Sequence, residues 1–352
     1  MSRNRNKQNR KFIEFKRYEH EIYLDINEAI LKSDIKIAQD VIEELGINEI
    51  HYMIKYYQKI VLNTLFFNDQ KMFLEYHKWL YRVYFYRRID LDFFAFLNQN
   101  FQNICLKYIK SDICINIGEF FDYIIKEHEQ LKKDASKKRY ILDEEDKAKT
   151  FAQALISGDS KKALQLCKKE SSSLDNFLLF YNDIVSNAMK YIGFLWESSE
   201  LSISKEHIAT NTLEEVIMEV LNSFENENKK EKHIFLSCAP SELHGLGVKV
   251  ASKVFQVQGY KVSNLGSNIP FEEVKKAIIE FKPDFIILTA TLQTSLIEVA
   301  SLIDEINKDK MIFSKDFKVA IAGGAFESLT SPSKLLQADF YLDELKDLNK
   351  YS

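Results

Sequence analysis

The chain has 352 residues, 46% hydrophobic and 28% charged, with a formal net charge of −4 at pH 7, which allows two or three domains with buried cores. No apolar run is long enough to predict a membrane span, the basic start lacks the apolar centre of a secretory signal, and the net charge does not favour nucleic-acid binding. Without metal-ligand spacing, the four cysteines are expected to be reduced and buried in a cytoplasmic protein (Cys105, Cys114, Cys167 and Cys238).

An N-terminal helical domain is predicted over residues 18–131, after a basic tail at residues 1–17. Five segments carry apolar residues at helical spacing: 19–45, 47–67, 70–88, 91–109 and 113–131. Turn and cap residues separate them, as between antiparallel helices. The basic residues of the tail are interpreted as solvated rather than as a DNA-binding arm (Arg3, Arg5, Lys7, Arg10 and Lys11).

A second helical block is predicted over residues 146–224, after a charged linker at residues 132–149. Its helices are expected at residues 147–168, with a break at Ser157-Gly158-Asp159, at 176–196, and at 204–224. Ser204 is expected to cap the last helix. A polar segment at residues 225–232 leads out of the block.

Strands and helices alternate over residues 232–346. Strands are predicted at residues 233–238, 261–265, 284–289, 318–321 and 338–341, and helices at 245–258, 271–281, 295–306 and 331–336. This order predicts a doubly wound, Rossmann-like parallel sheet, which binds ligands beyond the carboxyl ends of its strands. The fold class is therefore α/β plus all-α: an N-terminal helical domain, a helical-bundle cap and a C-terminal Rossmann-like domain.

Three short motifs fall at carboxyl ends of the predicted strands. They are Glu242-Leu243-His244-Gly245-Leu246-Gly247, Thr289-Ala290-Thr291 and Gly323-Gly324. A histidine at a strand-to-helix turn suits axial ligation of a metal, and Glu242 can hydrogen-bond the ring nitrogen that does not face the metal. Gly247 lets the next helix begin close to a bulky ligand.

This pattern resembles the cobalamin-binding domain that carries its cofactor base-off, with a protein histidine as the lower ligand to cobalt. Its motif reads Asp/Glu-x-His-x-x-Gly, about forty residues, Ser-x-Leu or Ser-x-Thr, then Gly-Gly. The resemblance implies that His244 is the metal ligand, and it implies six cofactor-binding residues: Glu242, Gly247, Thr289, Thr291, Gly323 and Gly324. Thr289 is expected to extend the hydrogen-bond relay from Glu242, and the two glycines to flank the nucleotide tail.

Two features depart from that family pattern. Thr289 stands where the family usually has serine, and the 31 residues between Thr291 and Gly323 exceed the usual gap. We assign the excess to an enlarged surface loop at residues 307–316.

A second pattern lies in the helical block, where Trp196 is followed after nine residues by Glu206-His207. It resembles the helical cap of the cobalamin-dependent light-sensing transcriptional repressors, in which these residues close over the upper, adenosyl face of the cofactor. A core tryptophan with a capping Glu-His pair is the alternative. Those repressors carry a histidine directly after the tryptophan, where this chain has Glu197, so we expect a water-ligated light product. Their helix-turn-helix DNA module is not visible here.

The resemblance implies a cobalamin-binding sensory protein, expected to be a cytoplasmic photoreceptor and not an enzyme. It would use adenosylcobalamin and signal through changed assembly or partner binding. We expect a homo-oligomer with a separate protein signalling partner, and no direct contact with nucleic acid or membrane. One alternative is a corrinoid methyl-transfer shuttle. Another is a photoreceptor for a tetrapyrrole, namely biliverdin with or without cobalamin.

The aromatic-rich N-terminal domain has two interpretations. The first is a large aromatic core or a dimer face. The second is a pocket for another chromophore, because the photocobilins, a subfamily of cobalamin photoreceptors, pair cobalamin with a bilin. His77 would then meet a pyrrole face, and Arg87 or Arg88 would meet propionates.

Overall fold

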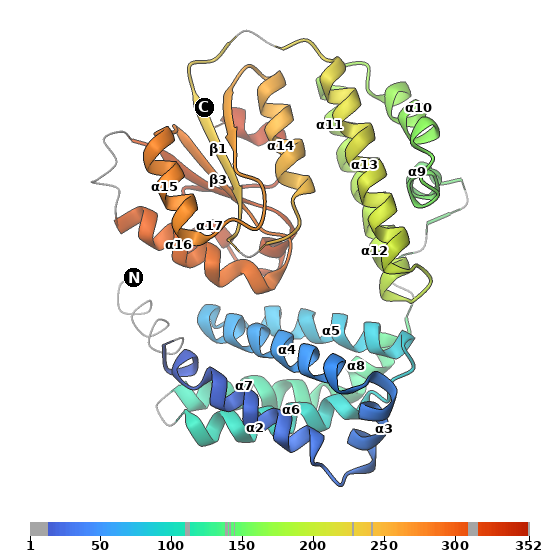
Figure 1. Ribbon diagram of the computed structural model, residues 1–352, viewed down its shortest axis with the longest axis vertical. Helices are drawn as coiled ribbons and strands as arrows, with labels where there is room; N and C mark the ends of the chain where they lie inside the picture. Colours follow the sequence, from blue (N-terminus) through green and yellow to red (C-terminus); the bar gives the residue numbers. More distant parts are fainter. Residues whose placement is uncertain are drawn as a thin grey trace. The chain divides into compact units, whose positions relative to one another are not determined.

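The computed structural model describes residues 13–109, 113–137, 140, 142–143, 145–226, 229–240, 242–308 and 316–350. The chain divides into two compact units, Met1–Lys138 and Arg139–Ser352, which are described separately (Figure 1). No described helix combines the length and the apolar character that crossing a lipid bilayer requires.

The first unit is helical, as predicted. Its helices are α2 (Glu19–Leu31), α3 (Lys36–Leu45), α4 (Ile47–Phe67), α5 (Gln70–Tyr86), α6 (Asp92–Tyr108), α7 (Ile113–Lys126) and α8 (His128–Ala135). The single helix predicted at residues 19–45 is broken, because Ser33 Oγ accepts from the Ile35 amide in a local turn. Residues 13–17, assigned to the tail, are helical, and Phe15 among them is buried. Residues 1–12 lie outside the described residues.

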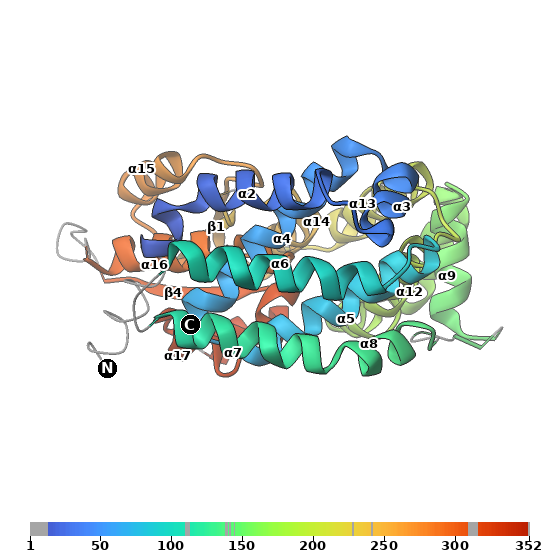
Figure 2. The ribbon, with the colours of Figure 1, turned by 90° about the horizontal axis from the view of Figure 1, so that it is seen from below.

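Aromatic side chains fill the core of this unit. Helix α6 packs against both α2 and α7, while α5 packs against α8 (Figure 2). The ring of Tyr57 lies 4.6 Å from that of Phe101 in an edge-to-face contact, between centroids. Six further aromatic residues of this unit are fully buried (Phe15, Phe73, Tyr81, Phe93, Phe94 and Phe121). Cys105 is buried in the same unit, whereas the side chain of Cys114 lies outside the described residues.

The second unit begins with a bundle of helices. These are α9 (Lys147–Ile156), α10 (Ser160–Glu170), α11 (Leu174–Phe180), a π-helix (Tyr181–Val185), α12 (Ser186–Glu197) and α13 (Ile203–Ser223). The prediction that Ser204 caps the last helix is wrong. That helix begins at Ile203, so the extended residue before it, Ser202, accepts from the amide of Lys205.

The rest of the second unit is a five-stranded parallel sheet, as predicted, and its strand order is β2-β1-β3-β4-β5. The strands are β1 (His233–Cys238), β2 (Lys261–Asn264), β3 (Phe285–Thr289), β4 (Lys318–Ala322) and β5 (Phe340–Leu342). Between them lie α14 (Leu246–Val257), α15 (Phe271–Phe281), α16 (Leu296–Lys308), which follows the 3-10 turn Gln293–Ser295, and α17 (Pro332–Leu336), which follows the 3-10 turn Gly324–Ser328; a last 3-10 turn is Leu345–Lys350. Successive strands are added on one side of β1 up to β2 and on its other side from β3 onward. Doubly wound folds bind ligands at this switch point, between β1 and β3.

The helical bundle and the sheet domain share one core. Val250 and Val254 of α14 are buried in the same apolar cluster as residues of α9 to α13. At the surface of this contact, Lys249 Nζ of α14 lies 2.6 Å from Glu214 Oε1 of α13. Helix α13 is therefore fixed against the helix that follows the His244 turn.

Candidate functional site

The three predicted motifs converge at the carboxyl ends of β1, β3 and β4. Backbone hydrogen bonds join their loops: the amide of Ala239 donates to the carbonyl of Thr289 at 2.7 Å, and the amide of Ala290 donates to that of Ala322 at 3.1 Å. The loops after β1, β3 and β4 therefore form one continuous surface at the reversal point of the sheet.

Glu242 and His244 form the centre of this surface. Glu242 is 1% exposed, whereas the His244 side chain is 53% exposed. His244 Nδ1 lies 2.5 Å from Glu242 Oε1, which also accepts from the His244 amide at 3.0 Å. Because the carboxylate engages Nδ1, the exposed ring presents Nε2 as the nitrogen that can bind a metal.

The second carboxylate oxygen of Glu242 is bound by the loop after β3. Oε2 accepts from the amides of Thr291 at 2.9 Å and Leu292 at 3.0 Å, and from Ser295 Oγ at 3.4 Å. Burial alone would raise the pKa of Glu242, but hydrogen bonds from the His244 ring and from the amides of Leu292, His244 and Thr291 lower it to about 2. The carboxylate is therefore a fixed buried anion.

The electrostatic surroundings of His244 favour its charged form when no metal is bound. The hydrogen bond to Glu242 raises the pKa of His244, while desolvation opposes that shift. Glu206, on α13 of the helical bundle, raises the pKa of His244 further through its charge. The negative field of Glu206 therefore reaches the imidazole from the bundle.

Thr289 does not extend the relay from Glu242, contrary to the prediction. Its hydroxyl donates to Cys238 Sγ at 3.4 Å, and Cys238 Sγ in turn donates to the carbonyl of His244 at 3.5 Å. Thr289 is the last residue of β3. The Glu242 side chain instead reaches Ser295, directly before α16. Thr291, also predicted, contributes its backbone amide.

The predicted glycines have different local environments. A Cβ on Gly323, which has a φ of +113°, would lie 2.4 Å from the carbonyl oxygen of Ala290, so only glycine fits between the two loops. A Cβ on Gly247 or Gly324 would meet nothing within 4 Å. Gly323 therefore serves close packing of the loops, while Gly247 and Gly324 leave open space beside them.

The predicted cap residues lie at the turn between α12 and α13. Trp196, one residue before the end of α12, is half-buried. Glu206 accepts from Thr210 Oγ1 at 2.9 Å, and the neighbouring His207 side chain is 71% exposed. Two apolar residues of the same α13 segment are also exposed, Ile203 by 61% and Ile208 by 46%.

Two structural contributors were missed from the sequence. The first is Ser295, whose hydroxyl reaches Glu242. The second is the loop after β2, in which the amide of Asn268 donates to the carbonyl of Glu242 at 2.8 Å. A Cβ on Gly245 would lie 3.0 Å from Ser267 Oγ of that loop. Gly266 directly after the second predicted strand was the available signal, since glycine marks a tight loop at a strand end.

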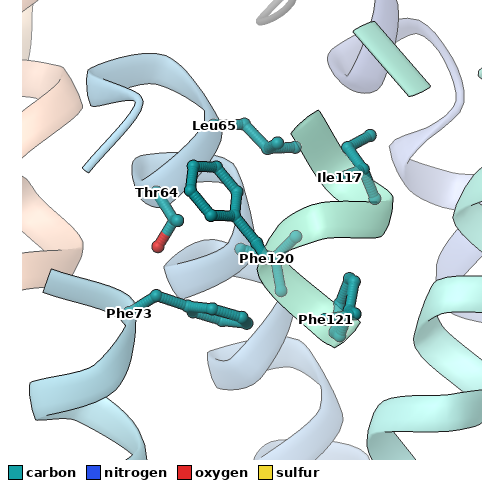
Figure 3. A pocket seen from close by; sticks show the side chains of 7 residues that line it. Thr64, Leu65, Phe73, Ile117, Phe120 and Phe121 are labelled. Carbon is teal, nitrogen blue, oxygen red and sulfur yellow. The ribbon is translucent and has the colours of Figure 1, made fainter. Parts of the chain in front are cut away.

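The first unit does not offer His77 to a chromophore. His77 is fully buried, with Nδ1 2.8 Å from the carbonyl oxygen of Phe73 and Nε2 2.8 Å from the phenol oxygen of Tyr57. A nearby cavity between α4, α5 and α7 has room for about one water molecule. Its walls are apolar except for Thr64 (Figure 3). Arg87, proposed to meet a propionate, lies 3.4 Å from Glu49.

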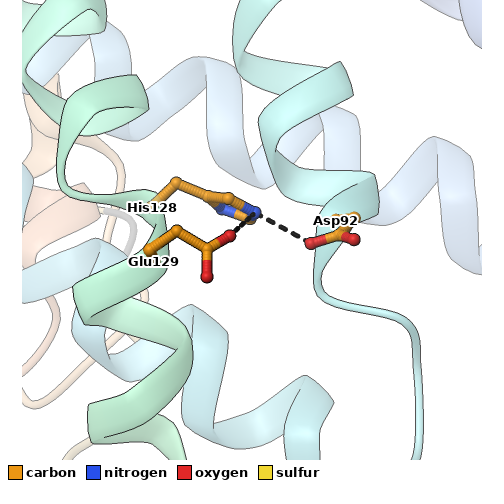
Figure 4. Close-up of side chains that lie close together, drawn as sticks. All are labelled: Asp92, His128 and Glu129. Carbon is orange, nitrogen blue, oxygen red and sulfur yellow. Dashed lines mark hydrogen bonds and ion pairs between the residues drawn. The ribbon is translucent and has the colours of Figure 1, made fainter.

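A cluster of possible metal ligands lies between α6 and α8, formed by Asp92, His128 and Glu129 (Figure 4). His128 Nε2 lies 3.0 Å from Asp92 Oδ1 and 3.9 Å from Glu129 Oε1. However, the ammonium group of Lys132 pairs with the same Asp92 oxygen and lies 3.6 Å from Glu129. A cation of the chain itself therefore neutralises these carboxylates, and we interpret the cluster as an ion-pair network.

The His244 site fits a metal held in a large flat ring. An exposed imidazole is oriented by a buried carboxylate, and Gly247 and Gly324, each with open space at the Cβ position, add no side chain to the surface. A metal ion alone would need further protein ligands, and among the described residues no cysteine and no second histidine side chain is hydrogen-bonded to the His244 imidazole, whose printed partner is Glu242.

Comparisons with known proteins agree with this fit. A family model described as a B12 binding domain matches residues 232–342, and a second model of that description matches residues 148–221. The chain is 22% identical over 148 residues to the HTH-type transcriptional repressor CarH of Myxococcus xanthus, covering 42% of this chain and 48% of the repressor. The match thus spans about half the length of that relative.

Corrinoid proteins are similar as well. A corrinoid protein of Desulfitobacterium hafniense is 24% identical over 179 residues, with 49% of this chain and 81% of the relative covered. Trimethylamine corrinoid protein 1 of Methanosarcina acetivorans is 22% identical, with 61% and 95% covered. The solved monomethylamine corrinoid protein of Methanosarcina barkeri is 18% identical, with a TM-score of 0.46 and with 57% of this chain and 94% of that chain covered. The two matched domains follow one another, the first over the helical bundle and the second over the sheet that carries His244. The chain therefore belongs to the cobalamin-binding domain proteins and resembles the CarH-type repressors among them.

Proposed function

We propose that this protein is a cobalamin-dependent sensor that responds to light and signals through a change in assembly or partner binding. It would hold adenosylcobalamin base-off, with His244 as the lower ligand to cobalt. We further propose that the protein is not an enzyme, and that it acts as a homo-oligomer with a separate protein partner. When bound, adenosylcobalamin supplies a weak bond between cobalt and carbon that light can break.

The observation that carries this proposal is the pairing of a helical bundle with the His244 site in one compact unit. Glu206 and Trp196 lie on the two helices that meet at the α12–α13 turn, and Glu206 acts electrostatically on His244. Exposed apolar residues on the same segment, Ile203 and Ile208, offer surface for an adenosyl group to cover. Loss of that group would expose this surface again, which gives the bundle two states to choose between.

Different residues would contact the metal, the nucleotide tail and the adenosyl group of the cofactor. His244 Nε2 would bind the metal from below, and Glu242 would fix its tautomer and ring orientation. Gly324, with open space beside it, would lie along the nucleotide tail. Trp196, Glu206 and His207 would face the adenosyl group from above.

A corrinoid methyl-transfer shuttle is the second candidate function. It is favoured by the corrinoid relatives, because their matches cover 81% and 95% of those proteins, against 48% of the repressor. In a shuttle, the upper face of the cofactor must stay open to partner enzymes. The Trp196 to Glu206-His207 segment favours the sensor, because it would cover that face.

One experiment separates the two. The protein is purified in the dark, and its absorption spectrum and gel-filtration volume are recorded with adenosylcobalamin and with methylcobalamin, before and after green light. A sensor should prefer the adenosyl form and change its elution volume on illumination. Equal binding of both forms, with no change in elution, would favour the shuttle. The spectrum of the pigment that copurifies also tests the biliverdin alternative, because a bilin absorbs at longer wavelength than cobalamin.

A further inference from the structure

Oε2 of the Glu242 carboxylate is held by groups that come from one short segment after β3. Two of its partners, the Thr291 and Leu292 amides, belong to the backbone and would persist in any side-chain variant. Ser295 is the third, and it is the partner that donates through a side chain to Oε2. Ser295 is therefore the position at which this half of the contact can be altered by substitution.

Ser295 is placed by the fold to make this contact. It is 3% exposed and ends the short 3-10 turn Gln293–Ser295 that leads into α16. Its amide donates to the carbonyl of Leu292 at 3.1 Å, so the turn itself fixes the residue. A buried serine held in this way loses little conformational freedom when its hydroxyl points at the carboxylate.

Thr289 takes part in a different contact. Its hydroxyl donates to Cys238 Sγ, and that thiol donates to the main-chain carbonyl of His244. Thr289 therefore acts on the backbone of the His244 turn, whereas Ser295 acts on the carboxylate that orients the imidazole.

We infer that Ser295 is a positioning residue for the Glu242–His244 pair, and that it takes the role that the sequence motif suggests for Thr289. This inference rests on the proposed function, in which His244 binds cobalt. Ser295 fixes the rotation of the Glu242 carboxylate, so that Oε1 faces His244 Nδ1 and Nε2 points at the metal. The fraction of bound cobalamin that carries the imidazole ligand then depends on the Ser295 hydroxyl.

The test is electron paramagnetic resonance of cob(II)alamin bound to protein labelled with 15N. An axial 15N nitrogen from the protein splits each cobalt line into two, whereas the 14N nitrogen of the cofactor's own base splits it into three. Ser295→Ala should lower the fraction of the two-line signal at saturating cobalamin and weaken binding by about tenfold. Ser295→Thr, which keeps the hydroxyl, should restore the two-line signal.

Ser252→Ala is the matched control, since Ser252 is a buried serine of α14 outside the site. It should keep the wild-type signal, and circular dichroism should show that all variants are folded. A structural defect alone would weaken binding without changing which nitrogen is bound at saturation.

Three results would overturn the inference, and they differ from one another. A wild-type two-line signal that Ser295→Ala leaves intact overturns the role of Ser295 while the proposed function stands. Loss of the two-line signal in Thr289→Val but not in Ser295→Ala returns the role to Thr289. A wild-type protein without the two-line signal overturns cobalt ligation by His244, and the inference with it.

Discussion

The amide of Thr291 donates to Oε2 of Glu242 across 2.9 Å, although 49 positions separate the two residues in the sequence. This contact joins the loop after β3 to the carboxylate that orients His244, so two of the three sequence motifs are parts of one hydrogen-bonded unit. Because Glu242 is buried and accepts all of these bonds, its charge and its shape both matter to the site.

Glu242→Gln should damage both folding and cobalamin binding. A glutamine side chain has one acceptor oxygen, so its NH2 group would face either His244 Nδ1 or the Thr291 and Leu292 amides. Leaving buried donors unpaired costs about 1–3 kcal/mol of unfolding free energy, and loss of a partner to a metal-binding histidine weakens binding about 10- to 100-fold. Urea unfolding of the apoprotein and titration with cobalamin measure the two effects. A variant with wild-type stability and affinity would contradict this account of the site.

The two glycines after β4 should respond in opposite ways to substitution. Gly323→Ala places a Cβ 2.4 Å from the Ala290 carbonyl at a φ of +113°, so it should destabilise the sheet domain by about 1–3 kcal/mol. Gly324→Leu meets open space in the apoprotein and should leave folding intact, but it should abolish cobalamin binding if the nucleotide tail passes there. Thermal unfolding and cobalamin titration of both variants check this. Full affinity in Gly324→Leu would place the tail elsewhere.

Much of the second unit can be predicted from its sequence for a physical reason. In the sequence, buried parallel strands are short apolar runs, and the helices between them carry apolar residues at helical spacing. These two patterns define β1, α14 and α15 closely. The ligand edge then follows from the strand order, because all parallel strands end on the same side. The fold class and the placement of His244 at that edge follow from these rules.

Contacts that depend on side-chain reach could not be predicted in the same way. The motif suggests Thr289 as the partner of Glu242. The positions of residues along β3 do not show that the Glu242 side chain extends past Thr289 to the Ser295 hydroxyl. Ser202 and Ser204 are chemically equal candidates for the helix cap, and only the backbone conformation before Ile203 decides between them. The π-helix Tyr181–Val185 leaves no pattern in residue spacing that distinguishes it from an α-helix.

The first unit should lose stability as pH falls below about 6.5. Burial lowers the pKa of His77 to about 4, from an ordinary value of 6.5, so the unfolded chain binds this proton over a range in which the folded chain does not. The neutral histidine contributes its full stability above pH 6.5, and that contribution, about 3 kcal/mol, is lost as pH falls from 6.5 towards 4. His77→Phe should be less stable at pH 7.5 but should lack this part of the pH dependence.

Tryptophan fluorescence can follow that unfolding specifically. The chain has two tryptophans, Trp79 in the first unit and Trp196 in the second, so a Trp196→Phe background reports on Trp79 alone. Urea unfolding between pH 7.5 and 5 is compared with and without His77→Phe. If the unfolding free energies of the two proteins change equally between pH 7.5 and 5, His77 does not titrate on unfolding.

Trp196 should set the preference for the upper ligand of cobalamin. It is half-buried next to the end of α12, and the following turn leads to Ile203, Glu206 and His207 on α13, which are the residues proposed to face the adenosyl group. Stacking an indole on an adenosyl group contributes about 1–3 kcal/mol, and a methyl group is too small to gain this contact. Wild-type protein should therefore bind adenosylcobalamin at least about tenfold more tightly than methylcobalamin.

Trp196→Ala should remove most of that preference and leave methylcobalamin affinity nearly unchanged, because the site around His244 is not altered. Titrations of the apoprotein in the dark with both cofactors give the ratio directly, and Trp79→Phe in the first unit serves as the control for loss of a tryptophan. Trp196→Ala should also no longer change its elution volume on illumination, since the contact that light removes is already absent. Glu197→His adds a companion test: a histidine beside Trp196 should convert a water-ligated light product into one with two imidazole ligands, visible in the absorption spectrum. A wild-type protein that binds both cofactors equally would contradict the role of Trp196 and would favour the methyl-transfer shuttle.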